Sequence, residues 1–210
     1  MIGAGEAAAR GVVDEPQFMF GYGSLAAEHA RCPIARLRGF RRTWGVAMDN
    51  LIDIPGYKSY RLRSDGSRPA VFVAFVDIED DAAGVVTGVC VPADATDLAA
   101  LDDRERNYDR IDVTSHVDGR PPGRVWAYRG SRAGRARLRD GLARGTAVVS
   151  RDYLDAVVAA IAAIAPDELA RVDGAAQQAG LGLLDLERID GPAAQKRRSQ
   201  VARPRRLPPP

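Results

Sequence analysis

The stretch "FMFGYGSLAAEHA", residues 18–30, joins a strand-like segment to a helix-like segment through a turn that contains two glycines. A short apolar run stops at Gly21-Tyr22-Gly23-Ser24, and a helix-like segment begins at Leu25. Glycine in a strand costs backbone entropy and packs no side chain. Two glycines around one tyrosine therefore indicate a turn in which the backbone must carry no side chain at these two positions. N–H groups in such a turn are suited to binding a carboxylate or phosphate, and Ser24 is expected to cap the helix or donate a hydrogen bond.

A second informative segment is "PADATDLAALDDRERNY", residues 92–108, which predicts a short helix. Two residues are candidates for its N-cap, Asp94 and Thr96. The apolar positions are Leu98 and Leu101, and the next position in this i, i+3, i+7 register is Glu105. The other residues of the last turn are expected to point outward: Asp102, Asp103 and Arg104.

The position of Glu105 allows two interpretations. In the first, its carboxylate faces an apolar pocket, which disfavours the charged form, raises the pKa and makes the group a general base or acid. In the second, the helix ends at Arg104, and Glu105 forms a salt bridge with an arginine such as Arg106 or Arg110. The pattern alone favours neither.

Further segments have the alternation or the β-branched content of strands. They are residues 35–48, 69–78, 84–91, 110–117 and 124–130, with a hairpin expected at the acidic "EDDAAG" between the second and third. A helix capped by Ser150 is predicted over 151–164, and a shorter one over 166–180. The class is therefore α+β, a small, mostly antiparallel β-barrel or sheet with flanking helices.

Composition divides the chain of 210 residues into three parts. Residues 1–16 are expected to form a flexible leader, 17–191 a single domain, and 192–210 a disordered tail rich in arginine and proline. The tail carries six basic groups and no acid, which leaves 24 basic against 28 acidic groups elsewhere. Because the body is mildly acidic, a nucleic-acid-binding domain is not expected, and only the tail is suited to contacting nucleic acid.

Other features exclude further classes of protein. No run of about 18 apolar residues is present, so no membrane-spanning helix is expected. The two cysteines, Cys32 and Cys90, form no Cys-x-x-Cys pair, which fits a reducing cytoplasm. His29 and His116 are far apart in the sequence and lack a paired acid pattern, so neither a metal site nor a catalytic triad is expected. The oligomeric state stays open.

The two motifs together resemble the gamma-glutamylcyclotransferase-like superfamily. Its aromatic strand and Tyr-Gly-Ser loop correspond here to residues 20–25, and its Leu-Asp-x-x-Glu segment to residues 101–105, followed by Tyr108. The later segments "VWAYRG" and "SRDYLDAVVAAI" are also similar to this family, and the resemblance spans residues 17 to about 165.

The resemblance implies a small β-barrel and a cofactor-free reaction on a small γ-glutamyl substrate. In that reaction the α-amine of the substrate attacks its own γ-carbonyl, which leaves 5-oxoproline and expels an amine or amino acid. Glu105 matches the catalytic glutamate, and four residues match the loop that holds the glutamyl part: Tyr22, Gly23, Ser24 and Leu25. Two further tyrosines are expected to line the pocket: Tyr108 and Tyr128.

One departure concerns the leaving group. Many relatives have glycine after the glutamate, whereas this chain has Arg106, a cation that would lower the pKa of the base or select an acidic leaving group. Residues 50–61 are expected to form a loop over the site. The alternative function is a non-catalytic module that binds a small ligand or partner on the same fold.

Overall fold

The computed structural model describes residues 15–54, 57–169, 172 and 174–191. The predicted tail, 192–210, lies outside the described residues, as does the predicted leader apart from its last two positions. The elements that follow therefore belong to the predicted domain of 17–191.

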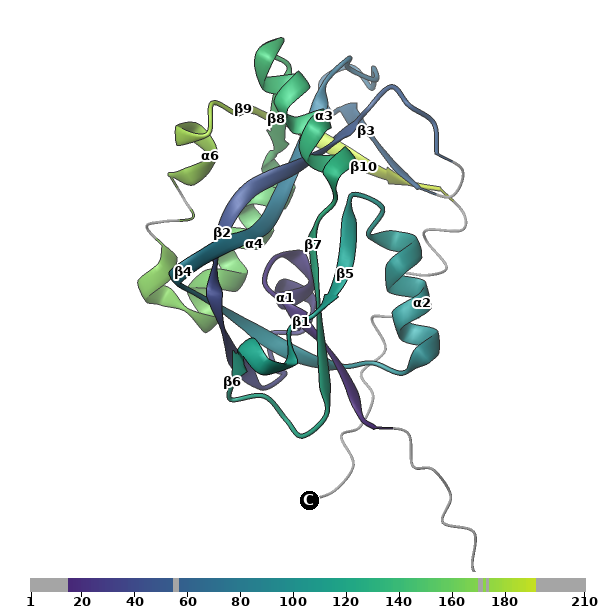
Figure 1. Ribbon diagram of the computed structural model, residues 1–210. Coiled ribbons are helices and arrows are strands. Elements are labelled where there is room, and N and C mark those ends of the chain that lie inside the picture. The colour runs from purple at the N-terminus through teal and green to yellow at the C-terminus, as the bar shows by residue number, and fades with distance from the viewer. Residues whose placement is uncertain (1–14, 55–56, 170–171, 173, 192–210) are drawn as a thin grey trace, which may run out of the picture.

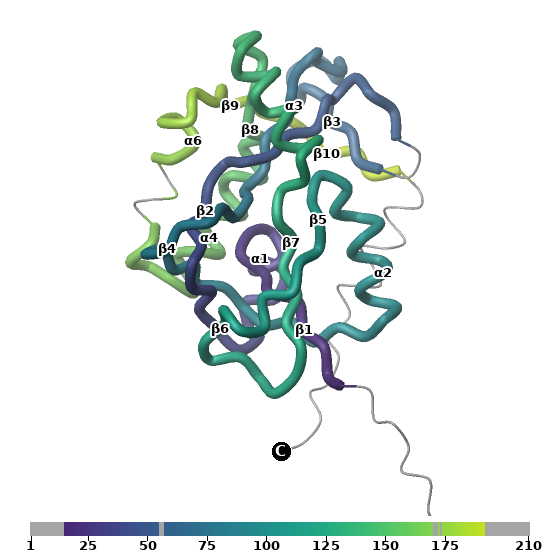
Figure 2. Tube along the Cα trace, in the orientation of Figure 1, coloured from purple at the N-terminus to yellow at the C-terminus, as the bar shows by residue number. Residues whose placement is uncertain are grey.

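An eight-stranded sheet forms the centre of the protein and curls into a half-barrel (Figures 1 and 2). Its strands are β1 (Gln17–Gly21), β2 (Ile34–Asp49), β4 (Phe72–Pro92), β5 (Tyr108–Asp112), β6 (Val117–Asp118), β7 (Arg124–Gly130), β8 (Ala147–Ser150) and β9 (Gly182–Leu184). The main path runs β5-β7-β1-β4-β2-β6, and β8 joins β4 to β9. The pairings β1–β7, β4–β8 and β8–β9 are parallel and the others antiparallel.

A separate two-stranded sheet and several helices surround the half-barrel (Figure 1). The small sheet pairs β3 (Lys58–Leu62) with β10 (Leu186–Asp190). The helices are α1 (Ser24–Glu28), α2 (Ala95–Arg104), α3 (Arg132–Ala143), α4 (Arg151–Ile164) and α6 (Ala175–Gln178), with 3₁₀ turns η1 (Thr114–His116) and η2 (Pro166–Glu168). The predicted α+β class with a mostly antiparallel sheet is confirmed.

The two longest strands, β2 and β4, curl because their pairing is interrupted twice. The register shifts between Arg38 and Phe40 and again between Trp44 and Val46. Gly39 lies at the first shift with a φ of 81°, a conformation that glycine adopts without strain. Such bulges bend a strand and increase its twist, so the pair can close around a core.

The hairpin predicted at residues 79–84 is wrong. Both halves of β4 pair with β2 in the same antiparallel direction, since Asp80 lies opposite Phe40 and Val85 opposite Arg38. The chain therefore bulges at the acidic segment and continues without reversing. Gly84 is needed there, because a Cβ at this position would lie 2.3 Å from the carbonyl oxygen of Phe40.

The strand predicted over 110–117 is also wrong in its second half. Asp112 ends β5, because its carboxylate accepts hydrogen bonds from both the backbone N–H and the hydroxyl of Thr114. This local bonding competes with the ladder and produces the turn η1 before the short β6. In the region predicted as the helix 166–180, the described residues form η2 and α6, and Gly180 follows with a φ of 73°.

Helix α3 was not predicted, because its sequence, "RAGRARLRDGLA", has almost no apolar stripe. Its buried residues are Gly134, Leu138 and Gly141. A Cβ at Gly141 would lie 2.7 Å from that of Phe72, so this face of the helix lies directly on the sheet. Close backbone packing thus replaces the usual large apolar side chains.

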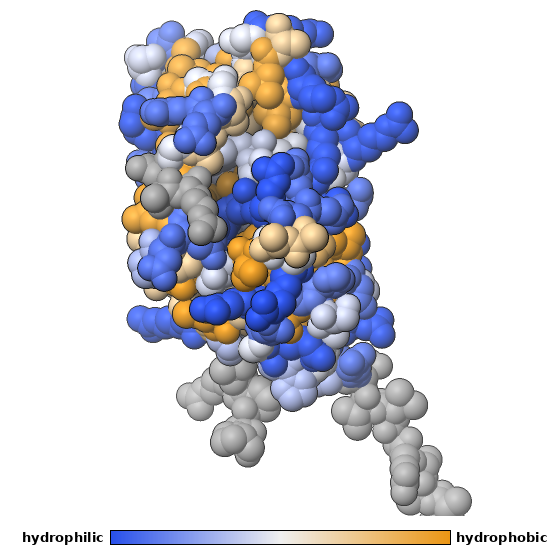
Figure 3. Space-filling model, turned by 60° about the vertical axis from the view of Figure 1, so that its left-hand side comes forward, coloured by the Kyte–Doolittle hydropathy of each residue, from blue (hydrophilic) through white to orange (hydrophobic). Residues whose placement is uncertain are grey.

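The core lies between the concave side of the sheet and helices α1 and α4. Its largest fully buried side chains include Phe20, Leu37, Ile78 and Ile161. Hydrophilic side chains cover much of the face in Figure 3, with smaller apolar areas between them. Among the described residues, no helix is long and apolar enough to cross a membrane.

Candidate active site

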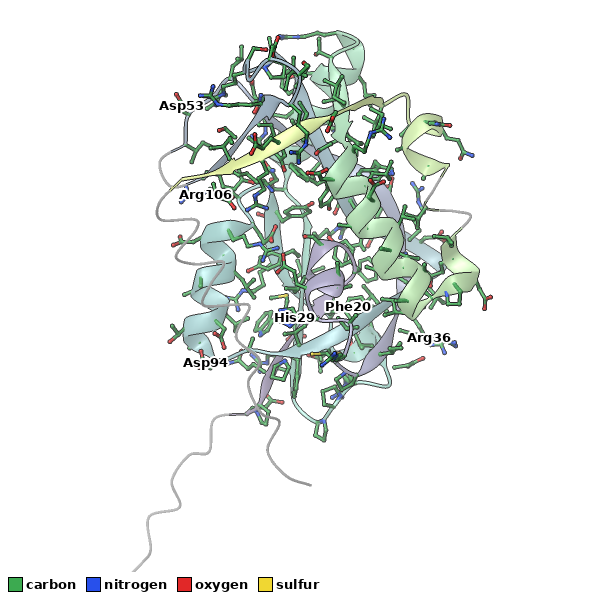
Figure 4. The ribbon with its side chains drawn as sticks, turned by 180° about the vertical axis from the view of Figure 1, so that it is seen from behind. Phe20, His29, Arg36, Asp53, Asp94 and Arg106 are labelled. Atoms are coloured by element: carbon green, nitrogen blue, oxygen red, sulfur yellow. The ribbon has the colours of Figure 1, made fainter. Side chains whose placement is uncertain are left out.

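The glycine loop connects β1 directly to α1 inside the half-barrel, where Figure 4 labels Phe20 and His29. Gly23 is the N-cap of α1, and its carbonyl oxygen accepts the N–H of Ala26 at 3.0 Å. Ser24 is thus the first helical residue and makes no capping bond. Within the described part of the chain, the backbone N–H groups of Gly23, Ser24 and Leu25 have no acceptor. Three donors therefore remain available at the loop.

Helix α2 brings Glu105 to the same place. Asp94 is its N-cap and accepts the N–H groups of Thr96 and Asp97, while Leu98 and Leu101 are buried as predicted. In Figure 4, Asp94 lies at the lower end of α2 and Arg106 beyond its upper end. The helix ends at Arg104, and Glu105 is the C-cap residue, whose N–H donates to the carbonyl oxygen of Leu101 at 2.8 Å. The side chain of Glu105 continues the buried register and lines the cavity.

The prediction that Arg104 points outward is wrong. Its side chain is only 14% exposed, with Nε 3.0 Å from Oε1 of Glu105 and Nη1 3.1 Å from Oε2 of Glu28. Burial alone lowers the pKa of Arg104, but the charges of Glu105 and Glu28 outweigh it and raise that pKa above its ordinary value. Glu105 therefore lines the pocket, as the first interpretation expects, although charged side chains line the same pocket. It also follows a helix that ends at Arg104 and forms a salt bridge, as the second interpretation expects, but with Arg104 and not with Arg106 or Arg110.

The predicted residues Tyr22, Tyr108 and Tyr128 line the cavity. Each hydroxyl donates a hydrogen bond to another residue of the protein. Tyr22 donates to the carbonyl oxygen of Tyr128 at 2.5 Å, and Tyr108 donates to that of Val76 at 2.6 Å. Tyr128 donates to Oδ1 of Asp102 at 2.7 Å. Burial raises the pKa of each of these tyrosines, so their hydroxyls stay protonated and hold the cavity wall in place.

All seven predicted site residues line one cavity of about 280 Å³: Tyr22, Gly23, Ser24, Leu25, Glu105, Tyr108 and Tyr128. Sequence reasoning missed other side chains in its wall: Glu28, Lys58, Tyr60, Phe75, Arg104, Asp152, Tyr153 and Arg188. Residues 58–61 of the predicted loop over 50–61 belong instead to strand β3, which supplies Lys58 and Tyr60. Arg188 comes from β10, a segment in which no sequence motif indicates a functional residue.

The cavity lies between α1, the end of α2, the β3–β10 sheet and α4 (Figure 4). It holds carboxylates, cations and aromatic rings together with free backbone donors. This combination is suited to a small zwitterionic ligand, and Glu105 can exchange a proton with it. A second cavity of about 440 Å³ borders Arg42 and Glu168, away from Glu105. In the described ranges, no three His, Cys, Asp or Glu side chains are grouped so that they could hold a metal ion.

Comparisons with known proteins agree with this arrangement. The model of the family "Gamma-glutamyl cyclotransferase, AIG2-like" matches residues 19–153, a range that includes both the loop and Glu105. No curated protein matches the sequence.

Two solved structures are similar in fold. One is a gamma-glutamyl cyclotransferase specific to glutathione from yeast, with 14% identity and a TM-score of 0.52 over 79% of this chain and 97% of that one. The other is YkqA from Bacillus subtilis, with 15% identity and a TM-score of 0.50 over 75% of this chain and 52% of that one. The chain thus spans about half the length of YkqA. Both likenesses concern the fold, whereas the family match covers most of the chain, and the protein therefore belongs to the gamma-glutamyl cyclotransferase, AIG2-like family.

Proposed function

We propose that the protein cyclises a γ-glutamyl compound to 5-oxoproline and releases an amine or amino acid, with Glu105 as the group that transfers protons. One observation carries this proposal: Glu105 and the loop of residues 21–25 line the same cavity. The family to which the chain belongs supports the reaction class.

The proposed reaction needs a base because an α-ammonium group is not a nucleophile. Glu105 takes one proton from it, and the free amine attacks the γ-carbonyl carbon to form the five-membered ring. The bond from this carbon to the leaving nitrogen then breaks. Of the three ammonium protons, one stays on the lactam nitrogen and two pass to the leaving nitrogen, which departs as an ammonium ion. Glu105 returns to its starting state, so only protons are exchanged and no cofactor is required.

The loop of residues 21–25 is proposed to hold the glutamyl part. Its three free N–H groups are suited to a carboxylate or to the negative charge that develops on the γ-carbonyl oxygen. The aromatic rings of Tyr22 and Tyr108 narrow the cavity and keep the flexible glutamyl chain folded. Such orientation contributes to the rate because the reacting nitrogen and carbon are held close together.

The setting of this activity is also proposed. We expect a domain of residues 17–191 to carry it, acting on a small molecule with no need of membrane or nucleic acid. Both Cys32 and Cys90 are free thiols, which fits the reducing cytoplasm.

The test is a panel of γ-glutamyl amino acids, peptides and amines, with 5-oxoproline measured by mass spectrometry. At least one compound should be converted by the parent protein. The Glu105→Gln variant keeps the shape and loses the titratable proton, so its turnover should fall by about 10²–10⁴-fold.

Glu187→Gln is the matched control, because this glutamate is exposed on β10 and does not line the cavity. It should keep the parent rate. If Glu105→Gln retains more than about a tenth of the turnover, the base is another group. If γ-glutamyl compounds bind but none is converted, the protein is the non-catalytic binding module instead.

A further inference from the structure

Lys58 places its ammonium group in the wall of the cavity that the glycine loop also lines. It is half-buried at the start of β3, and its Nζ lies 3.9 Å from the centre of the Phe75 ring and 5.4 Å from that of Tyr57. Both Lys58 and Phe75 line the cavity. The ammonium group therefore faces aromatic rings and the empty space of the site.

The other cations of the cavity wall have anionic partners within the protein. Arg104 pairs with Glu28 and Glu105, and Arg188 has its Nε 2.6 Å from Oδ1 of Asp190. Asp190 is the cross-strand neighbour of Lys58, but its carboxylate bonds to Arg188. Among the described residues, Lys58 is thus the lining cation with no carboxylate within 4 Å.

A charged amine in this position is costly unless an anion compensates it. Burial, followed by the charge of Arg188, lowers the pKa of Lys58 to about 7, while Glu105 and Asp190 act in the opposite direction and Arg104 in the same one. The protein keeps a lysine here with no ion pair of its own. A negatively charged group on the ligand would supply the missing partner.

The position of Lys58 in the cavity indicates which end of the substrate would carry the negatively charged group. The glycine loop and α1 line one part of the cavity, and β3 and β10 line another (Figure 4). Glu105 follows the last residue of α2 and is connected to Glu28 of α1 through Arg104. It also acts electrostatically on Lys58. If the glutamyl part occupies the loop and the reacting nitrogen meets Glu105, the leaving group extends toward β3 and β10.

We infer that Lys58 binds a carboxylate on the leaving group, so that the preferred substrates are γ-glutamyl amino acids or peptides and not γ-glutamyl amines. This inference rests on the proposed function and adds the substrate class and the residue that selects it. Arg106, the cation that the sequence suggested for this role, is exposed and does not line the cavity.

The test uses two compounds that differ by one carboxylate, γ-glutamyl-alanine and γ-glutamyl-ethylamide. Turnover is measured as kcat/KM for 5-oxoproline release, and affinity is measured by calorimetry with the Glu105→Gln variant to prevent conversion. The parent should prefer γ-glutamyl-alanine, and Lys58→Met should lower kcat/KM for it by about 10–100-fold, with a much smaller change for the ethylamide.

Two further variants complete the design. Lys58→Gln keeps a hydrogen-bond donor without the charge, so it should show the same loss for γ-glutamyl-alanine as Lys58→Met. Retained turnover of γ-glutamyl-ethylamide by both variants would show that lost folding is not the cause. Arg61→Met removes a cation from the exposed face of the same strand and should leave both compounds as in the parent protein.

The results separate this inference from the proposed function. Equal losses for both compounds mean that Lys58 contacts the glutamyl part or only supports the fold, and the inference fails while the function stands. A different result is that neither compound is converted, while γ-glutamyl-alanine binds more tightly than γ-glutamyl-ethylamide and loses this advantage when Lys58 is replaced. In that case the proposed function fails and the carboxylate site stands.

Discussion

Nε of Arg104 lies 3.0 Å from Oε1 of Glu105, and the same guanidinium contacts the carboxylate of Glu28 on α1. Arg104 thus connects the two sequence motifs, because Glu28 ends the helix that begins at the glycine loop. Its Nη2 also lies 3.5 Å from Oγ of Ser24, within the loop. The arginine can therefore fix both the direction of the Glu105 carboxylate and the position of the loop.

Replacing Arg104 by methionine should lower both activity and stability. The change leaves two largely buried carboxylates without their partner, which costs about 1–3 kcal/mol. We expect the melting temperature to fall by several degrees for a domain of this size and kcat/KM to fall at least about tenfold. Arg104→Lys, which keeps the charge, should recover part of both. Arg41→Met, which breaks the exposed pair with Glu79, is the control, and an effect of equal size there would argue against a special role for Arg104.

Replacing Arg106 by glycine, the residue that many relatives have, should change little. The side chain of Arg106 is exposed, and its Nε donates to the carbonyl oxygen of Asp103 at 3.1 Å. We expect kcat/KM for γ-glutamyl-alanine and γ-glutamyl-ethylamide to stay within about twofold of the parent values. If the preference between the two compounds changes, Arg106 and not Lys58 selects the acidic leaving group.

Much of the lining of the candidate site could be predicted from the sequence because the features that form it are local. The glycine pair around Tyr22 and the register from Leu98 to Glu105 each depend on only a few neighbouring residues. The structure contains both the turn before α1 and the buried register of α2. Arg104 was misplaced because a helical register treats its last turn as regular, whereas its long side chain bends back to two carboxylates. Lys58 and Arg188 come from strands whose pairing joins distant parts of the chain, and no local pattern predicts that.

The fold was predicted less completely for a similar reason. The strand over 124–130 agrees with β7, where apolar residues mark a buried strand. The segment 79–84 has the composition of a turn, but its conformation depends on the bulge at Gly39 in the partner strand. Helix α3 packs through glycines, so the apolar signal on which prediction relies is missing.

The pKa of Lys58 predicts how pH affects stability. The ordinary value of 10.5 applies to the unfolded chain, and burial together with Arg188 lowers the pKa to about 7 in the folded protein. Between these values the unfolded state binds one proton more, so this group makes the folded protein more stable as the pH rises from about 7 to about 10.5. Below pH 7 both states are protonated, and the full cost of the buried charge is present.

Lys58→Met should therefore melt at a higher temperature than the parent at pH 6, and the difference should shrink as the pH rises toward 10. Thermal melts at intervals of one pH unit measure this. The exposed-face variant Arg61→Met should show no such trend. A constant difference between Lys58→Met and the parent across the range would mean that the lysine titrates normally in the folded state.

Gly23 is required by packing and not by a positive φ, since its φ is −132°. A Cβ at this position would lie 2.6 Å from Cγ2 of Val76. Val76 has little freedom to move, because its carbonyl oxygen accepts the hydroxyl of Tyr108 and its N–H donates to that of Tyr153. We expect Gly23→Ala to push the loop into the cavity, which should weaken substrate binding about tenfold or more and destabilise the fold by about 1–3 kcal/mol.

The double variant Gly23→Ala/Val76→Ala tests the packing explanation. Removing the two methyl groups of Val76 makes room for the new Cβ, so the double variant should be more stable than the sum of the single effects predicts. A coupling of about 0.5–3 kcal/mol between the two sites is expected from chemical denaturation. If the changes in the free energy of unfolding are strictly additive, then a residue without a side chain is needed at position 23 for a reason other than contact with Val76.

The last prediction concerns Arg42, which holds the carbonyl oxygen of Tyr22 through its Nε at 3.0 Å. Because the described peptide bonds are trans, the C=O of Tyr22 and the N–H of Gly23 point in opposite directions, so this contact directs the N–H of Gly23 away from Arg42. The guanidinium itself is fixed by Glu168 and by the carbonyl oxygen of Thr87, each at 2.7 Å, and its side chain is only 7% exposed. Arg42 therefore acts as a positioning residue for the first free donor of the loop.

Arg42→Met should raise KM by about tenfold or more and lower kcat less, because the loop that binds the glutamyl part loses its orientation while Glu105 keeps its own contacts. The variant is also expected to be less stable, since Glu168 loses its buried partner. Arg135→Met separates the two effects, because it removes another partly buried arginine, the partner of Asp77, on a helix that does not line the cavity. If both variants lose stability and only Arg42→Met raises KM, the contact with Tyr22 positions the loop; if KM rises equally in both, Arg42 only supports the fold.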